Sequence, residues 1–295
     1  MSRPEHVSPP ELFYNEREAS KYARSTRMMQ IQSQISERAL ELLNLPDNTH
    51  GLLLDVGCGT GMSGSVIEEN GHAWIGVDIS KDMLDIAATN IKDEGSDGDV
   101  VHRDMGTGLG FRGGVFDGAI SISAVQWLCY SSHKEHVPKL RLKRFFQELY
   151  GALRRGARAV LQLYPETPQQ MELITSAAMA VGFTGGVVVD YPNSAKAKKF
   201  YLVLSAGQPT QLPRGKDGAG EERPLFHPGR RSANADTVDY ESERRGFRGK
   251  KRSRNEDVNI KSREWVMNKK DRQRRQGKEV ARDSKYSGRR RKGKF

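Results

Sequence analysis

A glycine-rich turn is the stretch whose residue types and spacing predict chemistry most directly. Leu53–Gly61 reads Leu-Leu-Asp-Val-Gly-Cys-Gly-Thr-Gly, so an apolar segment leads into three glycines at alternate positions. Glycine lacks a Cβ atom, which lets a turn between a strand and a helix bring backbone close to a ligand. A dinucleotide-binding turn needs glycine at its first, third and sixth positions, whereas the sixth position here is Met62. The turn therefore predicts a cofactor other than a dinucleotide.

Two acids follow the next strand-like segments. Asp78 comes about twenty residues after the turn, where a carboxylate can accept hydrogen bonds from both hydroxyls of a ribose. Asp104 follows a third short strand. Either acid alone could be a structural residue at a strand end. The turn and the two acids together, in this order and spacing, favour a cofactor site.

The pattern Asp-x-Gly-x-Gly-x-Gly resembles the cofactor loop of Rossmann-like methyltransferases. The resemblance implies that Asp55 helps orient the ammonium group of S-adenosylmethionine and that backbone at Gly57, Gly59 and Gly61 lines this cofactor. It also implies further cofactor contacts after the second, third and fourth strands, namely Asp78, Ile79, Asp104, Met105, Ser121 and Ile122.

The elements that position these residues alternate between strand and helix. Strands are expected at Gly51–Val56, Ala73–Val77, Val100–His102, Gly118–Ser123, Ala157–Tyr164, Val187–Tyr191 and Lys199–Ser205. Helices are expected at Glu16–Leu45, Met62–Asn70, Asp82–Ile91, Leu140–Leu153 and Met171–Val181. The alternation predicts an α/β fold with a mostly parallel seven-stranded sheet, and the short polar turn between the last two strands predicts an antiparallel hairpin at its edge. This is the layout of the Rossmann-like methyltransferase fold.

Charge divides the chain of 295 residues into two parts. Residues 207–295 carry 27 Lys and Arg against 13 Asp and Glu, a balance of +14, whereas residues 1–206 have a balance of −3. Such asymmetry predicts a polyanionic partner, although a merely solvating tail is the alternative. The expected organisation is an N-terminal helical cap (1–50), a methyltransferase domain (51–206), a low-complexity linker (207–250) and a basic RNA-binding tail (251–295).

Other features narrow the class of protein. Cys58 and Cys129 are the two cysteines, and their spacing is unlike that of metal ligands or a disulfide framework, so no metal is expected. The N-terminus has no apolar core like that of a secretory signal, and no apolar run approaches the ~20 residues of a membrane span. A soluble intracellular protein without a membrane partner is expected.

Aromatic residues near strand ends are candidates for holding the methyl acceptor. Gln126 and Trp127 come just after the fourth expected strand, and Tyr164 ends the fifth. Open α/β sheets bind ligands at this edge, and an aromatic ring can stack on a splayed-out base with about 1–3 kcal/mol. Trp127 could equally be a core residue. The expected RNA contacts of the tail are Lys269, Lys270, Arg272, Arg274, Arg275 and Lys278.

The chain resembles one family along nearly its whole length, the eukaryotic small-subunit (18S) rRNA guanine-N7 methyltransferases. The segments that carry the resemblance are Glu11–Tyr14, Glu18–Tyr22, Leu54–Gly61, Ala124–Leu128, Leu163–Glu166, Arg263–Met267 and Asp283–Gly288. It implies methylation of a guanosine in 18S rRNA and a role in small-subunit biogenesis, with Tyr14 joining the base-positioning candidates. Guanine N7 carries a lone pair and no proton, so alignment suffices and no general base is expected. A second catalytic cysteine and an Asn/Asp-Pro-Pro-Phe/Tyr motif, typical of other base methyltransferases, are absent.

The resemblance also implies a partner and a compartment. Family members need a small zinc-binding activator protein, and Val100–His102 is the expected edge strand for this heterodimer. The basic tail favours the nucleus, including nucleolus and nucleoplasm, with some cytoplasmic presence. Two other functions stay open: a non-catalytic ribosome-assembly factor that keeps a cofactor site, and a methyltransferase for tRNA or a small molecule.

Overall fold

The computed structural model of the chain describes residues 3–46, 49–131, 133, 135–194, 197–207, 212–216, 267, 270, 282 and 283. The chain divides into two units, residues 1–238 and 239–295, and the elements below belong to the first. None of the described helices combines the length and the apolar character needed to cross a membrane.

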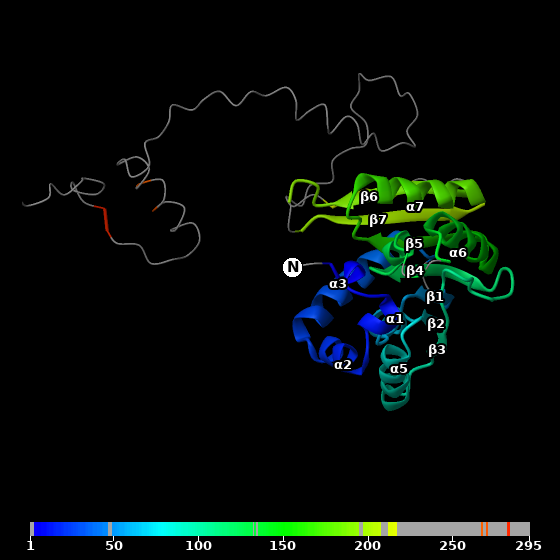
Figure 1. Cartoon of the computed structure of the whole chain (residues 1–295), viewed down its shortest axis with the longest axis horizontal. Helices are drawn as coiled ribbons and strands as arrows, with labels where there is room; N and C mark the ends of the chain where they lie inside the picture. The colour runs from blue at the N-terminus through cyan, green and yellow to red at the C-terminus, as the bar shows by residue number, and fades with distance from the viewer. Residues whose placement is uncertain are drawn as a thin grey trace, which may run out of the picture. The chain divides into compact units, whose positions relative to one another are not determined.

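Seven strands form one sheet in the order β3-β2-β1-β4-β5-β7-β6 (Figure 1). Their bounds are β1 Leu52–Val56, β2 Ala73–Asp78, β3 Asp99–His102, β4 Phe116–Ile122, β5 Leu153–Leu163, β6 Phe183–Asp190 and β7 Lys199–Ala206. Within this order the five strands β3, β2, β1, β4 and β5 are parallel to their neighbours, and β7 runs antiparallel to both β5 and β6. The predicted mostly parallel sheet with an antiparallel hairpin at its edge is confirmed.

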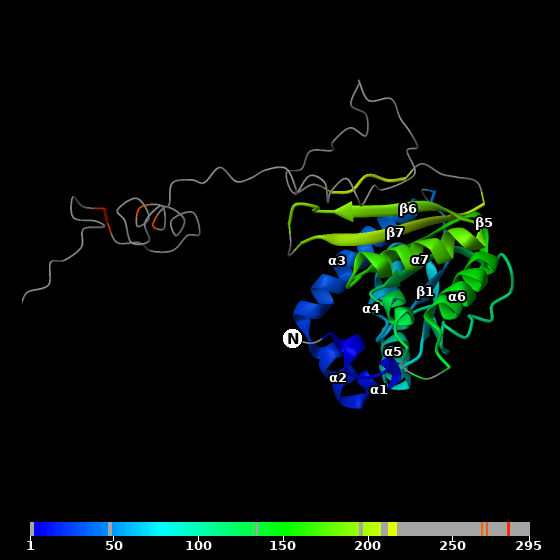
Figure 2. The same cartoon turned by 45° about the horizontal axis from the view of Figure 1, so that its top comes forward.

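Helices cover both faces of the sheet (Figures 1 and 2). The helices are α1 Pro10–Phe13, α2 Glu16–Arg24, α3 Thr26–Leu43, α4 Met62–Glu69, α5 Lys81–Glu94, α6 Pro138–Ala152 and α7 Pro168–Val181, with 3-10 turns η1 Pro4–His6 and η2 Val125–Cys129. One core cluster joins α3, α4 and α5 to the sheet, and the other joins α6 and α7 to it. Leu53 and Leu54 are both fully buried but belong to different clusters. Successive side chains of a strand point to opposite faces, so the apolar run in β1 serves both layers.

The N-terminal helix predicted over Glu16–Leu45 is two helices, so that prediction is wrong in this respect. Ser25 separates α2 from α3 with an extended backbone (φ −81°, ψ 97°). Its hydroxyl accepts a hydrogen bond from the backbone N–H of Met28 at 3.4 Å. Serine is a favoured N-cap because its short side chain satisfies a free N–H group in the first turn. The apolar spacing continues across this cap, which is why periodicity alone predicts one helix.

Strand β6 begins four residues earlier than the predicted Val187–Tyr191, at Phe183. The additional residues include Gly185 and Gly186, which normally weaken a strand. Gly185 has φ +139°, and a Cβ atom there would lie 2.0 Å from the carbonyl oxygen of Val203 on β7. Glycine is therefore required at this position by the close approach of the neighbouring strand.

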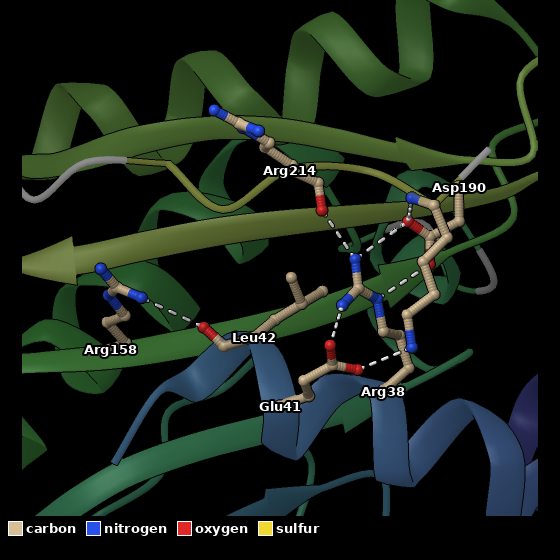
Figure 3. Close-up of polar contacts among 7 residues, drawn as sticks. Arg38, Glu41, Leu42, Arg158, Asp190 and Arg214 are labelled. Carbon is tan, nitrogen blue, oxygen red and sulfur yellow. Dashed lines mark hydrogen bonds and ion pairs between the residues drawn. The ribbon is translucent and has the colours of Figure 1, made fainter. Parts of the chain in front are cut away.

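A buried ion pair fastens the described stretch 212–216 to the sheet and to α3. Arg38 of α3 donates through Nε to Asp190 Oδ2, at the end of β6, at 2.9 Å. The Arg38 side chain also reaches the backbone carbonyl of Arg214 at 2.8 Å (Figure 3). The backbone N–H of Lys216 donates to Asp190 Oδ1 at 2.8 Å. Three segments distant in sequence are thus held by one guanidinium and one carboxylate.

Candidate active site

A cavity of about 550 Å³ lies at the C-terminal ends of β1, β2 and β4, and this volume suits a ligand of cofactor size. The predicted site residues that line it are Gly57, Gly59, Asp78, Ile79, Asp104, Met105, Ile122, Gln126, Trp127, Tyr14 and Tyr164. Asp55, Gly61 and Ser121 do not line it. The structure thus brings together residues from both predicted groups, those for the cofactor and those for the acceptor.

The glycine turn after β1 depends on left-handed backbone. Gly57, Gly59 and Gly61 have φ values of +76°, +55° and +86°. A Cβ atom on Gly57 would lie 2.2 Å from the Cβ of Ala124, in the loop after β4. Gly61 is the N-cap residue of α4 and does not line the cavity, and a Cβ atom on it would lie 3.5 Å from that of Ala87. The glycines therefore serve two purposes: the first two shape the cavity wall, and the third begins the helix.

Asp78 connects the loops that follow β1 and β2. Its Oδ2 accepts a hydrogen bond from the backbone N–H of Gly59 at 2.9 Å, and its Oδ1 accepts one from Ser80 at 2.8 Å. Burial raises the pKa of Asp78, while these backbone N–H groups act in the opposite direction. A carboxylate has about four lone-pair sites, so Asp78 can hold the turn and still accept a hydrogen bond from a ligand hydroxyl.

Asp55 lies behind the cavity wall and is fully buried. Ser63 Oγ donates to its Oδ2 at 2.5 Å, while Oδ1 has no hydrogen-bond partner among the described residues. Burial raises the pKa of Asp55 to about 7; Ser63 opposes this shift, and the charge of Asp78 adds to it. A buried carboxylate oxygen without a donor is costly, and it fits a site that receives a cationic group.

Asp104 is already engaged by protein donors. Arg141 Nη2 lies 2.6 Å and 2.7 Å from its two oxygens, and the backbone N–H of Gly106 donates to Oδ1 at 2.8 Å. Met105 lines the cavity beside it, as do Arg103 and Arg141, which sequence reasoning missed. Asp104 is thus fixed in orientation, with fewer free lone pairs than its position in the sequence suggests.

Side-chain hydrogen bonds tie the end of β4 and the residue after it to both neighbouring strands. Ser121 is buried, and its Oγ donates to the carbonyl oxygen of Val56 at 2.7 Å, so it ties β4 to β1. Ser123 has φ +58°, an uncommon conformation for a residue other than glycine. Its Oγ donates to Gln162 Oε1 at 2.6 Å, which holds this bend against β5.

Two of the predicted base-positioning side chains, Tyr14 and Trp127, lie together in the cavity wall. Tyr14 and Trp127 meet edge to face with ring centroids 6.0 Å apart, and Phe13 lies 6.3 Å from Trp127. Burial raises the pKa of Tyr22 to about 12 and raises that of Tyr14 as well. These hydroxyls therefore stay protonated near neutral pH. Trp127 is 7% exposed, so it belongs to the core and also lines the cavity.

Several lining residues could not be found from the motifs. Helix α3 contributes Met28, Ile31 and Gln32, although its apolar spacing predicts only a core-facing helix. Arg3 and Glu5 of the N-terminal segment also line the cavity. Arg3 contacts Tyr164 and Glu5 contacts Gln126, and more than a hundred residues separate the two members of each pair. A single sequence gives no signal for such pairs.

Of the predicted RNA contacts in the tail, Lys270 is the one that the structure describes. Its Nζ lies 2.9 Å from Asp283 Oδ1. Lys269, Arg272, Arg274, Arg275 and Lys278 lie outside the described residues.

Two family models match the chain. Residues 53–156 match a methyltransferase domain, and residues 204–293 match a family described as methyltransferase involved in Williams-Beuren syndrome. Two solved structures with a TM-score of 0.50 are of Haemonchus contortus phosphoethanolamine N-methyltransferase 2. One complex contains S-adenosylhomocysteine (16% identity, 66% of this chain and 58% of that chain), and the other S-adenosylmethionine (14%, 70% and 61%). At such identities they support the fold alone.

Three curated relatives match essentially the full chain. The 18S rRNA (guanine-N(7))-methyltransferase of Mus musculus is 54% identical over 99% of this chain and 98% of its own length. The Bos taurus protein of the same name is 52% identical with the same coverage. The Saccharomyces cerevisiae 18S rRNA (guanine(1575)-N(7))-methyltransferase is 44% identical over the whole of both chains. The similarity confirms the predicted family: the chain belongs to the S-adenosylmethionine-dependent 18S rRNA (guanine-N7)-methyltransferases.

Proposed function

We propose that this protein transfers a methyl group from S-adenosylmethionine to N7 of a guanosine in 18S rRNA during assembly of the small ribosomal subunit. The observation that carries the proposal is the full-length similarity to relatives named for this reaction. The cavity at the strand ends supports it, because this edge of an open α/β sheet is where such folds bind their ligands.

In this proposal the cofactor lies along the ends of β1, β2 and β3. Backbone at Gly57 and Gly59 lines it, and Gly61 keeps the turn in shape. Asp78 accepts from the ribose hydroxyls beside Ile79. Asp55 supplies negative charge near the ammonium group of the cofactor. Asp55 Oδ1, which has no hydrogen-bond partner among the described residues, suits this role. Asp104 and Met105 flank the adenine, and Ser121 and Ile122 support the methyl-donor end.

The acceptor base lies against the aromatic side chains, with Trp127, Tyr164 and Tyr14 around the ring and Gln126 at its edge. The bound cofactor supplies an electrophilic methyl group on a sulfonium. The N7 lone pair forms the new N–C bond while the C–S bond breaks with its electrons going to sulfur. No proton leaves N7, so the protein needs to align the two groups and exclude water. The protonated tyrosines have no role as bases in this reaction.

The proposed partner is a small zinc-binding activator protein that adds to β3, the edge strand that contains Val100–His102. The backbone N–H of Arg103, just after β3, points toward β2 and donates to the backbone carbonyl of Asp78 at 2.8 Å. Backbone groups of successive strand residues point to opposite sides, so those of Val100 and His102 face away from the sheet. Val101 is 36% exposed. An edge of this kind can accept a strand from another protein.

The basic tail is proposed to bind rRNA in precursor ribosomal particles and to direct the protein to the nucleus, mainly the nucleolus and nucleoplasm, with some protein in the cytoplasm. Its charge balance of +14 supports both roles. The proposed domains follow this division of roles: a helical cap (1–50), the methyltransferase domain (51–206), a linker (207–250) and the basic tail (251–295).

The test is methyl transfer from labelled S-adenosylmethionine to precursor small subunits, with the full-length protein and its co-purified partner. We expect label in 18S rRNA with the wild type, and at least a tenfold loss with Asp78→Asn, which removes one acceptor from the ribose site. Asp85→Asn is the matched control, because Asp85 is exposed on α5, does not line the cavity, and pairs at 3.6 Å with the exposed Lys81. Label that enters tRNA, protein or a small molecule in place of 18S rRNA would contradict the proposal.

A further inference from the structure

The first turn of the chain, Arg3–His6, is held against the acceptor side of the cavity. Arg3 Nη1 donates to the backbone carbonyl of Tyr164 at 2.7 Å. His6 Nε2 lies 2.9 Å from Glu166 Oε2 and its ring packs edge to face on Tyr130, with centroids 5.4 Å apart. These contacts join residues about 160 positions apart in sequence. The segment therefore forms part of the wall around the proposed base site.

Glu5 lies in this segment, lines the cavity and is half-buried. Gln126 Nε2 donates to Glu5 Oε1 at 3.4 Å and to the carbonyl oxygen of Ser123 at 2.7 Å. In the part of the chain that the structure describes, no Lys, Arg or His forms an ion pair with Glu5. The amide of Gln126 thus holds the Glu5 carboxylate next to the end of β4, where the described residues supply it with no ion-pair partner.

The surroundings of Glu5 suit a planar base. Tyr14 lies close enough that the charge of Glu5 adds to the rise of the Tyr14 pKa, which burial causes in the first place. Tyr14, Trp127 and Tyr164 line the same cavity. A carboxylate only accepts hydrogen bonds, so a base edge that carries two donors is the edge it can bind.

Guanine has such an edge, because N1–H and the 2-amino group are adjacent donors. Adenine presents a ring acceptor at N1, which a carboxylate repels. Methylation at N7 also places a positive charge on the purine ring and makes N1–H a better donor. A hydrogen bond from N1–H to a carboxylate therefore becomes stronger as the methyl group is transferred, and this lowers the barrier.

We infer that Glu5 is the residue that recognises guanine, by accepting hydrogen bonds from N1–H and the 2-amino group, and that Gln126 positions it. This inference rests on the proposed function and adds a role for a residue that no sequence motif contains. In the transfer step the N7 lone pair forms the bond to the methyl carbon and the sulfur receives the electron pair of the C–S bond. The base becomes cationic, with Glu5 facing the added charge.

The experiment compares guanosine and inosine 5′-monophosphate as competitive inhibitors of methyl transfer to precursor small subunits. Inosine lacks the 2-amino group and is otherwise identical. With the wild type we expect guanosine monophosphate to inhibit about 10- to 100-fold more strongly, since one hydrogen bond to a charged group is lost. With Glu5→Gln we expect this ratio to approach one and the single-turnover rate to fall at least tenfold. Binding of S-adenosylhomocysteine is expected to stay unchanged and reports that the variant is folded.

Glu16→Gln is the matched control, because it makes the same chemical change at an exposed side chain of α2 that does not line the cavity. We expect this variant to keep the inhibition ratio. A Glu5→Gln variant that retains the wild-type ratio would overturn the inference, and so would a Glu16→Gln variant that loses it to the same extent. A wild type inhibited equally, or not at all, by the two nucleotides would also overturn it. These outcomes leave the proposed function intact, whereas a wild type that puts no label into 18S rRNA contradicts that function itself.

Discussion

Asp55 combines full burial with one carboxylate oxygen that has no donor. Its pKa is raised by burial to about 7 from an ordinary value of 3.8. Between pH 3.8 and about 7, the Asp55 carboxyl group is protonated in the folded state and ionised in the unfolded state. The free energy of unfolding therefore falls as pH rises from about 4 to 7, and the cost of the buried charge persists above pH 7.

Asp55→Asn removes that buried charge while keeping an acceptor for Ser63. We expect the variant to melt on the order of 5 °C higher than the wild type at pH 8.5, with a much smaller difference at pH 4.5. We also expect its affinity for S-adenosylmethionine to fall about tenfold, since the ammonium group loses a carboxylate. Thermal unfolding and calorimetric titration at both pH values measure these effects. A gain in stability of equal size at the two pH values would show that the carboxylate charge is not the cause.

Gly57 and Gly59 offer a matched pair of substitutions in the cavity wall. Both have positive φ, so alanine at either position costs about 1–2 kcal/mol of backbone strain. Gly57→Ala also places a Cβ atom 2.2 Å from that of Ala124, whereas the nearest atom to a Cβ on Gly59 is Met83 Cε at 3.5 Å. We expect Gly57→Ala to lose about 2 kcal/mol more stability than Gly59→Ala in urea unfolding. Equal losses would mean that the loop after β4 moves aside freely.

The strand ends could be predicted from sequence because each carries its own local signal. The turn at Gly57–Gly61 and the acids that follow β2 and β3 are recognisable within a few residues. The N-terminal wall could not be predicted, since Arg3 and Glu5 owe their places to contacts with Tyr164 and Gln126. Such contacts form only once the whole sheet has folded and are not encoded in any local pattern.

At the scale of elements, α3 has two roles that its sequence pattern does not separate. Its first half lines the cavity with Met28, Ile31 and Gln32, and its second half packs on the sheet. The break at Ser25 sets the start of this helix, and Arg38 fixes its far end to β6. Apolar periodicity predicts that the helix packs on the core, whereas its orientation over the cavity comes from the cap and the ion pair.

The ion pair in Figure 3 gives a prediction about this element. Asp190→Ala removes the buried carboxylate that pairs with the Arg38 guanidinium and leaves the exposed carboxylate of Glu41, and we expect a loss of about 3–5 kcal/mol in the free energy of unfolding. Glu41→Gln is the control: the Glu41 side chain is 55% exposed, so its bond to Arg38 should contribute less than about 1 kcal/mol. Urea unfolding of both variants measures the difference. Similar losses for the two would contradict the importance of burial here.

At the scale of the whole molecule, the chain joins a nearly neutral catalytic body to a strongly basic tail. Deletion of residues 250–295 is expected to leave the affinity for S-adenosylmethionine unchanged and to weaken binding to precursor small subunits. If ten tail cations meet phosphates in the full chain, log K falls with log salt with a slope of roughly −7 to −9, and the deletion should remove most of this slope. Filter binding at several salt concentrations tests this. Equal affinity and equal slope without the tail would rule out its role in RNA binding.

We propose that this cavity aligns a guanine ring nitrogen with the methyl donor and that the transfer needs no general base. The most direct test identifies the atom that is methylated. Precursor small subunits are labelled by the full-length protein with isotopically labelled S-adenosylmethionine, and the purified 18S rRNA is digested to nucleosides. We expect the label in 7-methylguanosine. Label on an exocyclic amine, on a ring carbon or on ribose would contradict this proposal, because those acceptors must lose a proton during the reaction.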